Sequence, residues 1–150
     1  VSLDASSESY PLHTFNLLNE GVMQKIAKAF KLQPSEIASA TLDAGTVKAD
    51  GFSGPAEGKV AVGLTNPDGK VSYAYSANGI GFWIAADGTA SSWGDAPIYY
   101  EYDASGYGLT VGHNPGHSEK GKTYTIKPTM VYNKGGKLHK AVITIKMKFA

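Results

Sequence analysis

Apolar and polar residues follow two different periods along this chain of 150 residues. Over residues 16–30 apolar side chains recur every three or four positions, with lysines on the opposite side, which predicts an amphipathic helix. Residues 34–40 predict a second, shorter helix, because Pro34 suits a first helical turn. From residue 46 onward the period changes to two, which predicts β-strands.

Turn signals divide the second part of the chain into four successive hairpins. Gly, Asn, Asp and Ser gather at residues 66–69, 87–88, 104–106 and 133–136. We expect the paired strands at residues 60–64 and 71–75, 79–86 and 89–93, 97–103 and 107–112, and 122–132 and 137–149. The last strand alternates Ile145, Met147 and Phe149 with Lys146 and Lys148, so that one face is buried and the other is wet.

These patterns predict an α+β, mostly β fold: an antiparallel β-sandwich or jelly-roll-like meander of about eight strands with a short N-terminal helical pair. Residues 1–9 are interpreted as a flexible linker and residues 10–150 as a single β-rich domain, with a helical cap at about 16–41 and the sandwich at about 46–150. Residues 10–15 predict an edge strand, because Pro11 cannot donate to a ladder. Asn19 is the expected helix N-cap.

Composition narrows the classes of partner. The chain has no cysteine, so disulfides and thiolate sites are excluded, and its basic residues are all lysine, with a net charge of +1. A helix–turn–helix DNA reader is disfavoured, because the second helix is short and carries no lysine. We therefore expect no nucleic-acid partner. No apolar run reaches the length of a membrane-spanning helix, so we expect the chain not to span a membrane. A lipid anchor carried by a parent chain is the alternative route to a membrane surface.

The sequence contains few of the residue patterns that are typical of catalytic or metal-binding sites. The motifs of nucleophilic hydrolases, zinc proteases and phosphate-binding loops do not occur. Asp95, Glu101 and Asp103 are the candidate carboxylates for a glycosidase, although carboxylates on strand faces and in turns are usually solvated. His113 and His117 are four residues apart in a predicted turn, where a polar loop in which His113 caps a strand is the simpler interpretation. We therefore predict that the protein is not an enzyme and that it binds no cofactor and no metal ion.

Aromatic residues are concentrated in residues 79–116, which contain both tryptophans. Period-two counting places Phe82 on one strand face and Trp83 on the other, which leaves a core role and a binding role open for Trp83. Trp93 lies at a strand end or in a loop, beside Asp95, and is expected to be exposed. A sugar ring offers apolar faces bordered by hydroxyls, which such a pair could hold.

A second group of candidates follows from the strand at residues 97–103. Tyr100 and Tyr102 alternate with Tyr99 and Glu101, and the latter two would share a wet face. For the tyrosines, core packing or cross-strand pairing is the favoured role, with ligand contact as the alternative. Asn114, in the loop that follows, is a further candidate to hydrogen-bond a sugar.

The segments GFWIAADGTASSWGD and YGLTVGHNPGHSEKGKTYTIKPTMVYNKGGK resemble a domain family of unknown function found in cell-surface glycan-utilisation proteins of Bacteroidetes. The resemblance involves residues 81–95, 112–116 and 120–132, and Trp83, Trp93, Gly94 and Asp95 match its pattern. It implies a β-rich accessory module of glycan-utilisation lipoproteins or glycoside hydrolases, with no established catalytic residues. His113 stands where a neutral polar residue is expected, so its role stays open.

We therefore expect a non-catalytic carbohydrate-binding module of an exported or cell-surface protein, located at the cell surface or in the periplasm, with a poly- or oligosaccharide partner. The expected ligand-binding residues are Trp93, Trp83, Asp95, Asn114, Tyr99 and Glu101. Two alternatives remain: a structural or protein-interaction domain with its aromatic residues in the core, and a small glycoside-active enzyme.

Overall fold

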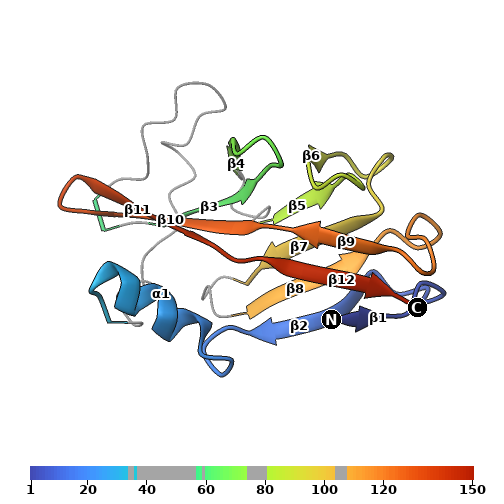
Figure 1. Cartoon of the computed structure of the whole chain (residues 1–150), viewed down its shortest axis with the longest axis horizontal. Helices are drawn as coiled ribbons and strands as arrows, with labels where there is room; N and C mark the ends of the chain where they lie inside the picture. The colour runs from blue at the N-terminus through green and yellow to red at the C-terminus, as the bar shows by residue number, and fades with distance from the viewer. Residues whose placement is uncertain (34–35, 37–56, 59, 74–80, 104–107) are drawn as a thin grey trace.

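The structure, a computed structural model, describes residues 1–33, 36, 57–58, 60–73, 81–103 and 108–150. These residues form a mostly β fold with one helix and three sheets (Figure 1). The elements are β1 (Ser2–Leu3), β2 (Pro11–Asn16), α1 (Val22–Phe30), β3 (Val60–Thr65), β4 (Val71–Tyr73), β5 (Gly81–Ile84), β6 (Ala90–Ser91), β7 (Ile98–Tyr102), β8 (Gly108–His113), β9 (Thr123–Ile126), β10 (Pro128–Lys134), β11 (Lys137–Val142) and β12 (Ile145–Phe149).

The predicted hairpins are confirmed. Antiparallel pairing joins β3 to β4, β5 to β6, β7 to β8 and β10 to β11. At the β5–β6 turn Gly88 has φ +92°, a conformation that glycine adopts without steric cost, as the Asp-Gly signal predicts. The expected edge strand is confirmed as β2, which pairs with β8 and begins at Pro11. A five-stranded sheet results, in the order β2-β8-β7-β5-β6.

The two longest predicted strands are each divided in the structure. The segment predicted at residues 122–132 forms β9 and β10, and the segment at 137–149 forms β11 and β12. β9 pairs with β12 in a three-stranded sheet, and β10 pairs with β11 in a four-stranded sheet. With β1 and β2 added, the described residues contain twelve strands rather than about eight. The alternation predicted for the last strand is confirmed in β12.

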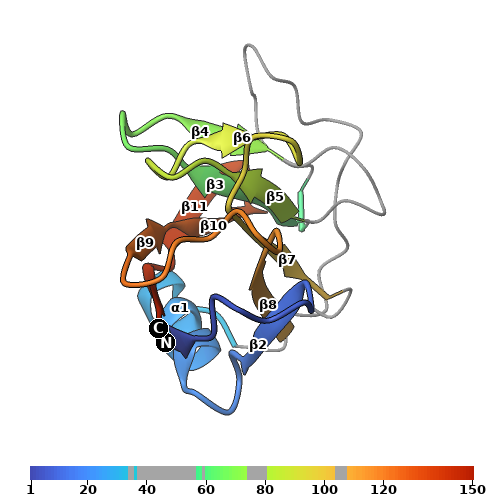
Figure 2. The same cartoon turned by 90° about the vertical axis from the view of Figure 1, so that its right-hand side faces the viewer.

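The core lies between the five-stranded sheet and the two smaller sheets, whose strands surround it in Figure 2. Tyr100 of β7 is buried there, and its hydroxyl donates a hydrogen bond to the carbonyl of Gly63 in β3, which joins the two layers. The largest fully buried side chains are those of Tyr100, Tyr124, Phe149, Leu17, Met23, Leu64, Ile84, Ile98, Leu109, Ile126 and Met147. Their burial provides the main favourable term for folding.

The helical region departs from the prediction. α1 begins at Val22 rather than at residue 16, and its N-cap is Gly21 rather than Asn19. The side-chain oxygen of Asn16 accepts hydrogen bonds from the backbone N–H groups of Leu18 and Asn19, which stabilises a turn in place of a first helical turn. The second predicted helix, at residues 34–40, lies almost wholly outside the described residues.

The N-terminal residues, predicted to be a flexible lead-in, are tied to the fold. β1 runs parallel to β12, and Leu3 is buried in the core. The N-terminal amine donates a hydrogen bond to the carbonyl of Lys146 at 2.8 Å. As a result the two ends of the chain lie side by side in both views (Figures 1 and 2).

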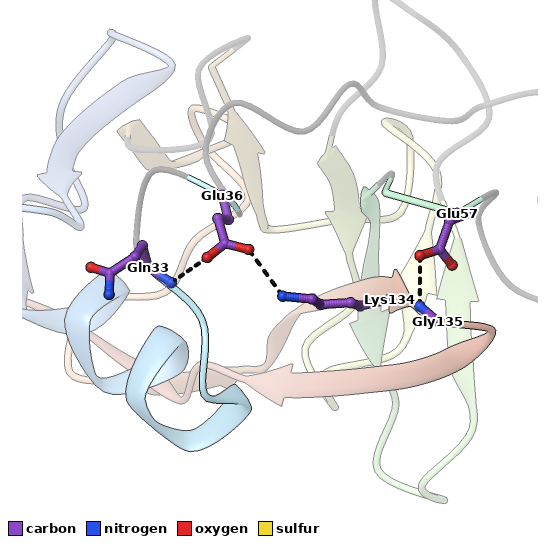
Figure 3. Close-up of polar contacts among 5 residues, drawn as sticks. All are labelled: Gln33, Glu36, Glu57, Lys134 and Gly135. Carbon is purple, nitrogen blue, oxygen red and sulfur yellow. Dashed lines mark hydrogen bonds and ion pairs between the residues drawn. The ribbon is translucent and has the colours of Figure 1, made fainter.

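The tip of the β10–β11 hairpin is held by two carboxylates (Figure 3). Glu57 accepts hydrogen bonds from the backbone N–H groups of Gly135 at 2.6 Å and Gly136 at 3.0 Å. Glu36 accepts one from the ammonium group of Lys134 at 3.1 Å. The two hydrogen bonds hold the pKa of the Glu57 carboxyl below its usual value.

Candidate functional site

Three aromatic rings gather on the solvent-facing side of the five-stranded sheet, which we call the outer face. Trp83 of β5 is directly opposite Tyr99 of β7, and their ring centroids are 5.0 Å apart. Tyr10, just before β2, contacts Trp83 edge-on, with centroids 6.2 Å apart. These three residues, the aromatic row, come from separate parts of the chain and form a partly exposed cluster of rings.

Alternation along the strands explains why the row faces outward. In β7 the buried residues are Ile98, Tyr100 and Tyr102, whereas Tyr99 is partly buried and Glu101 is exposed. In β5 Ile84 is fully buried and Trp83 takes the opposite side. The sequence left both roles open for Trp83, and the structure places it outside the core cluster.

Gly112 of β8 makes room for Tyr99. It is paired with Tyr99 on one side and with Pro11 on the other. A Cβ atom at this position would come within 2.5 Å of the Tyr99 Cε1 atom and would also collide with the backbone carbonyl of Tyr10. The absence of a side chain therefore allows the Tyr99 ring to lie across β8.

Glu101 lies beside the row, in the next register of the sheet. It is opposite Gly81 on β5 and opposite Thr110 on β8. The hydroxyl of Thr110 is 2.9 Å from that of Thr14 on β2, so hydroxyl groups border the carboxylate. Burial, and secondarily the charge of Glu101, raise the pKa of Tyr99 to about 12, which keeps its phenol neutral and able to donate a hydrogen bond.

Trp93 and Asp95 occupy the turn between β6 and β7. Trp93 is 57% exposed, as its position in the sequence predicts, and Asp95 is exposed as well. The backbone N–H groups of Asp95 and Ala96 both donate to the carbonyl of Ser92, which closes the turn. Trp93 therefore offers an indole face to solvent on a hydrogen-bonded turn.

Asn114 holds this turn and is not available to a ligand. Its side chain is only 2% exposed, and its amide nitrogen donates a hydrogen bond to the carbonyl of Trp93 at 2.8 Å. Its backbone N–H donates to the carbonyl of Pro97. The expectation that Asn114 hydrogen-bonds a sugar is therefore corrected: a buried amide with a backbone partner positions the Trp93 turn.

The two neighbouring imidazoles lie in different surroundings. His113 is fully buried, stacked on Phe149 at 5.7 Å, and its Nδ1 atom is 2.7 Å from the Ser118 hydroxyl. His117 is exposed in the turn that contains Gly116. His113 ends a strand, as expected, because it is the last residue of β8, but its side chain is buried in the core rather than exposed in a polar loop.

The carboxylates considered for glycosidase chemistry do not face one another. Glu101 lies on β7 with Asp103 just beyond its end, two residues along on the same side, and Asp95 lies in the turn before that strand. A glycosidase needs its pair on opposite sides of the scissile bond. Among the described residues no group of three or more His, Asp or Glu side chains could hold a metal ion, and no helix is long and apolar enough to span a membrane.

Sequence reasoning missed Tyr10, Gly112 and the Thr14–Thr110 pair. Tyr10 was assigned to an edge strand, and the chain gives no local signal that its ring reaches Trp83 across the sheet. A glycine within a strand is a known sign of a close approach, so Gly112 could have been singled out.

The chain belongs to the family described as domain of unknown function DUF4859, whose model matches residues 9–137. Searches against curated proteins and against solved structures gave no significant match. The match covers the five-stranded sheet and the Trp93 turn and assigns no activity to either.

Proposed function

We propose that this domain is a non-catalytic carbohydrate-binding module, and that the outer face of the five-stranded sheet is its binding surface. The observation that carries the proposal is the aromatic row. The partly exposed rings of Trp83 and Tyr99 lie against each other on a rigid sheet, with a carboxylate and two hydroxyl groups beside them. A pyranose ring can stack on the exposed face of an aromatic ring, and its hydroxyl groups can donate hydrogen bonds to a carboxylate.

The proposed contacts divide between two places. Trp83 and Tyr99 stack on one sugar and Glu101 accepts its hydrogen bonds, while Trp93 and Asp95 supply a second contact from their turn. A single stacked ring contributes about 1 kcal/mol, so a shallow platform of this kind binds weakly. Modules of this class gain strength when several act together, which suits an exported parent protein at the cell surface or in the periplasm.

The test is affinity-gel electrophoresis against a panel of polysaccharides. Wild type is compared with Trp83→Leu, Trp93→Ala and the control Leu138→Ala, which removes an exposed apolar side chain on β11. Melting temperatures are measured for each. We expect at least one polysaccharide to retard wild type and the control, and retardation to fall for Trp83→Leu with its melting temperature within a few degrees of wild type. If no polysaccharide retards wild type, or Trp83→Leu is retarded equally, the proposal is overturned.

A further inference from the structure

Charge is segregated between the two layers of the protein. None of the five strands that form the five-stranded sheet carries a lysine, and no lysine occurs between Lys70 and Lys120. The smaller sheets carry lysines at 134, 137, 140, 146 and 148. The acidic residues between Lys70 and Lys120 are Asp87, Asp95, Glu101, Asp103 and Glu119. The five strands that bear the aromatic row therefore carry one carboxylate, that of Glu101, and no lysine, and Asp87, Asp95 and Asp103 lie outside these strands.

Glu101 is the acidic residue placed to act with the rings. Its carboxylate is exposed, and no ion pair or hydrogen bond engages it within the part of the chain that the structure describes. It lies two positions from Tyr99 on the same strand face, roughly 7 Å along the strand. Gly81, directly opposite on β5, has no side chain, and a Cβ atom there would come within 2.6 Å of the Glu101 Cα atom, so the backbones of β5 and β7 approach closely beside the carboxylate.

We propose that the outer face selects saccharides that carry a protonated amine, of the glucosamine type, over neutral and acidic saccharides. This inference rests on the proposed function and names the class of sugar. A glucosamine ring stacked on Trp83 and Tyr99 extends its 2-ammonium group sideways, within reach of Glu101. The ammonium group gains Coulomb attraction from the carboxylate and cation–π attraction from the ring faces. A uronic acid would meet the same carboxylate with a like charge, and none of the five strands of this sheet carries a lysine to compensate it.

The test uses two oligosaccharides with the same backbone. Glucosamine hexamers and their N-acetylated counterparts are titrated into wild type by calorimetry, at a pH at which the free amine is protonated and at low ionic strength. Oligogalacturonate is the acidic comparison. Each titration is repeated with Glu101→Gln and with the control Glu119→Gln, which removes an exposed carboxylate paired with Lys122.

We expect the amine form to bind about three- to ten-fold more tightly than the N-acetylated form, and oligogalacturonate to bind most weakly. Glu101→Gln should abolish this preference, because it weakens binding of the amine form more than binding of the N-acetylated form, and Glu119→Gln should preserve it. Added salt should reduce the preference, because it screens exposed charges.

Other outcomes overturn the inference and separate it from the proposed function. Equal binding of the two hexamers, or an equal loss of preference in Glu101→Gln and Glu119→Gln, removes Glu101 as the selecting residue. If neither hexamer binds but a neutral polysaccharide is retained in a Trp83-dependent manner, the inference fails and the proposed function stands. If wild type binds no saccharide at all, both fail.

Discussion

The indole ring of Trp83 lies 5.0 Å from the phenol ring of Tyr99, at directly opposed positions on β5 and β7. Their neighbours along the same strands, Ile84 and Tyr100, are fully buried. The same two strands therefore build the core with one set of side chains and the outer face with the other. Trp83 and Tyr99 lie outside the core cluster. We therefore expect that substitutions of these two residues can weaken binding with little loss of stability.

Replacing Gly112 with Ala should disturb the aromatic row. The new Cβ would collide with the Tyr10 carbonyl and come within 2.5 Å of the Tyr99 ring, so we expect a loss of about 1–3 kcal/mol in the free energy of unfolding. Urea denaturation measures the loss. Gly94→Ala is the matched control, because its Cβ would meet no atom within 4 Å. Equal stability of the two variants would contradict this account of Gly112.

Tyr100 and Tyr102 form a matched pair of buried tyrosines on β7. The Tyr100 hydroxyl donates to the Gly63 carbonyl, whereas the buried Tyr102 hydroxyl has no hydrogen-bond partner among the described residues. We expect Tyr100→Phe to lower the free energy of unfolding by about 1–2 kcal/mol and Tyr102→Phe to leave it unchanged or raise it. Thermal or urea unfolding of both variants tests this, and a larger loss for Tyr102→Phe would refute it.

Local signals made the hairpins predictable. The Asp-Gly pair at residues 87–88 and the alternation of β12 each depend on neighbouring residues, and both were confirmed. The helix start was missed, because Asn19 suits an N-cap as well as Asn16 suits the turn that forms instead. The local sequence fits both a helix that starts after Asn19 and a turn stabilised by Asn16. The burial of Leu17 in the core, which is not a local property, accompanies the turn.

The candidate site was predictable only in part, because its assembly is non-local. Outward placement of Tyr99 and Glu101 follows from alternation along one strand, and the structure bears it out. The contact between Tyr10 and Trp83 depends on β2 pairing with β8, nearly one hundred residues away. Burial of Asn114 likewise depends on its hydrogen bond to the carbonyl of Trp93, and the sequence alone does not indicate that these two residues lie close together.

Asn114→Ala should act on binding through Trp93. The substitution removes the hydrogen bond to the Trp93 carbonyl and leaves that oxygen without its side-chain donor, so we expect a loss of about 1–2 kcal/mol in stability. Retardation in the affinity gel should fall in this variant, and the same substitution should cause no further fall in a Trp93→Ala background. The exposed Asn19→Ala is the control. Additive losses of retardation would show that Asn114 acts independently of Trp93.

Alkaline titration should distinguish Tyr99 from freely exposed tyrosines. Its pKa is raised from 10.0 to about 12, chiefly by burial and secondarily by Glu101. The folded state therefore favours the neutral phenol, and this contribution to stability is complete below pH 10 and is lost as the pH rises through about 12. The difference in ultraviolet absorbance between wild type and Tyr99→Phe reports the transition. In a Glu101→Gln background it should move to lower pH, and an unchanged midpoint would exclude an effect of Glu101.

Glu57→Gln should weaken the hold on the β10–β11 hairpin in a pH-dependent way. Hydrogen bonds from Gly135 and Gly136 lower the pKa of Glu57 below its usual 4.5 in the folded state. A lowered pKa means that the ionised carboxylate stabilises the fold above pH 4.5, and that this contribution is lost as the pH falls through the folded-state value. The melting temperature of Glu57→Gln should therefore lie below that of wild type at pH 7, and the gap should narrow as the pH falls below 4.5. Glu8→Gln, at an exposed position before β2, should show no such gap. A gap that stays constant down to pH 2 would mean that the charge of Glu57 does not hold the hairpin.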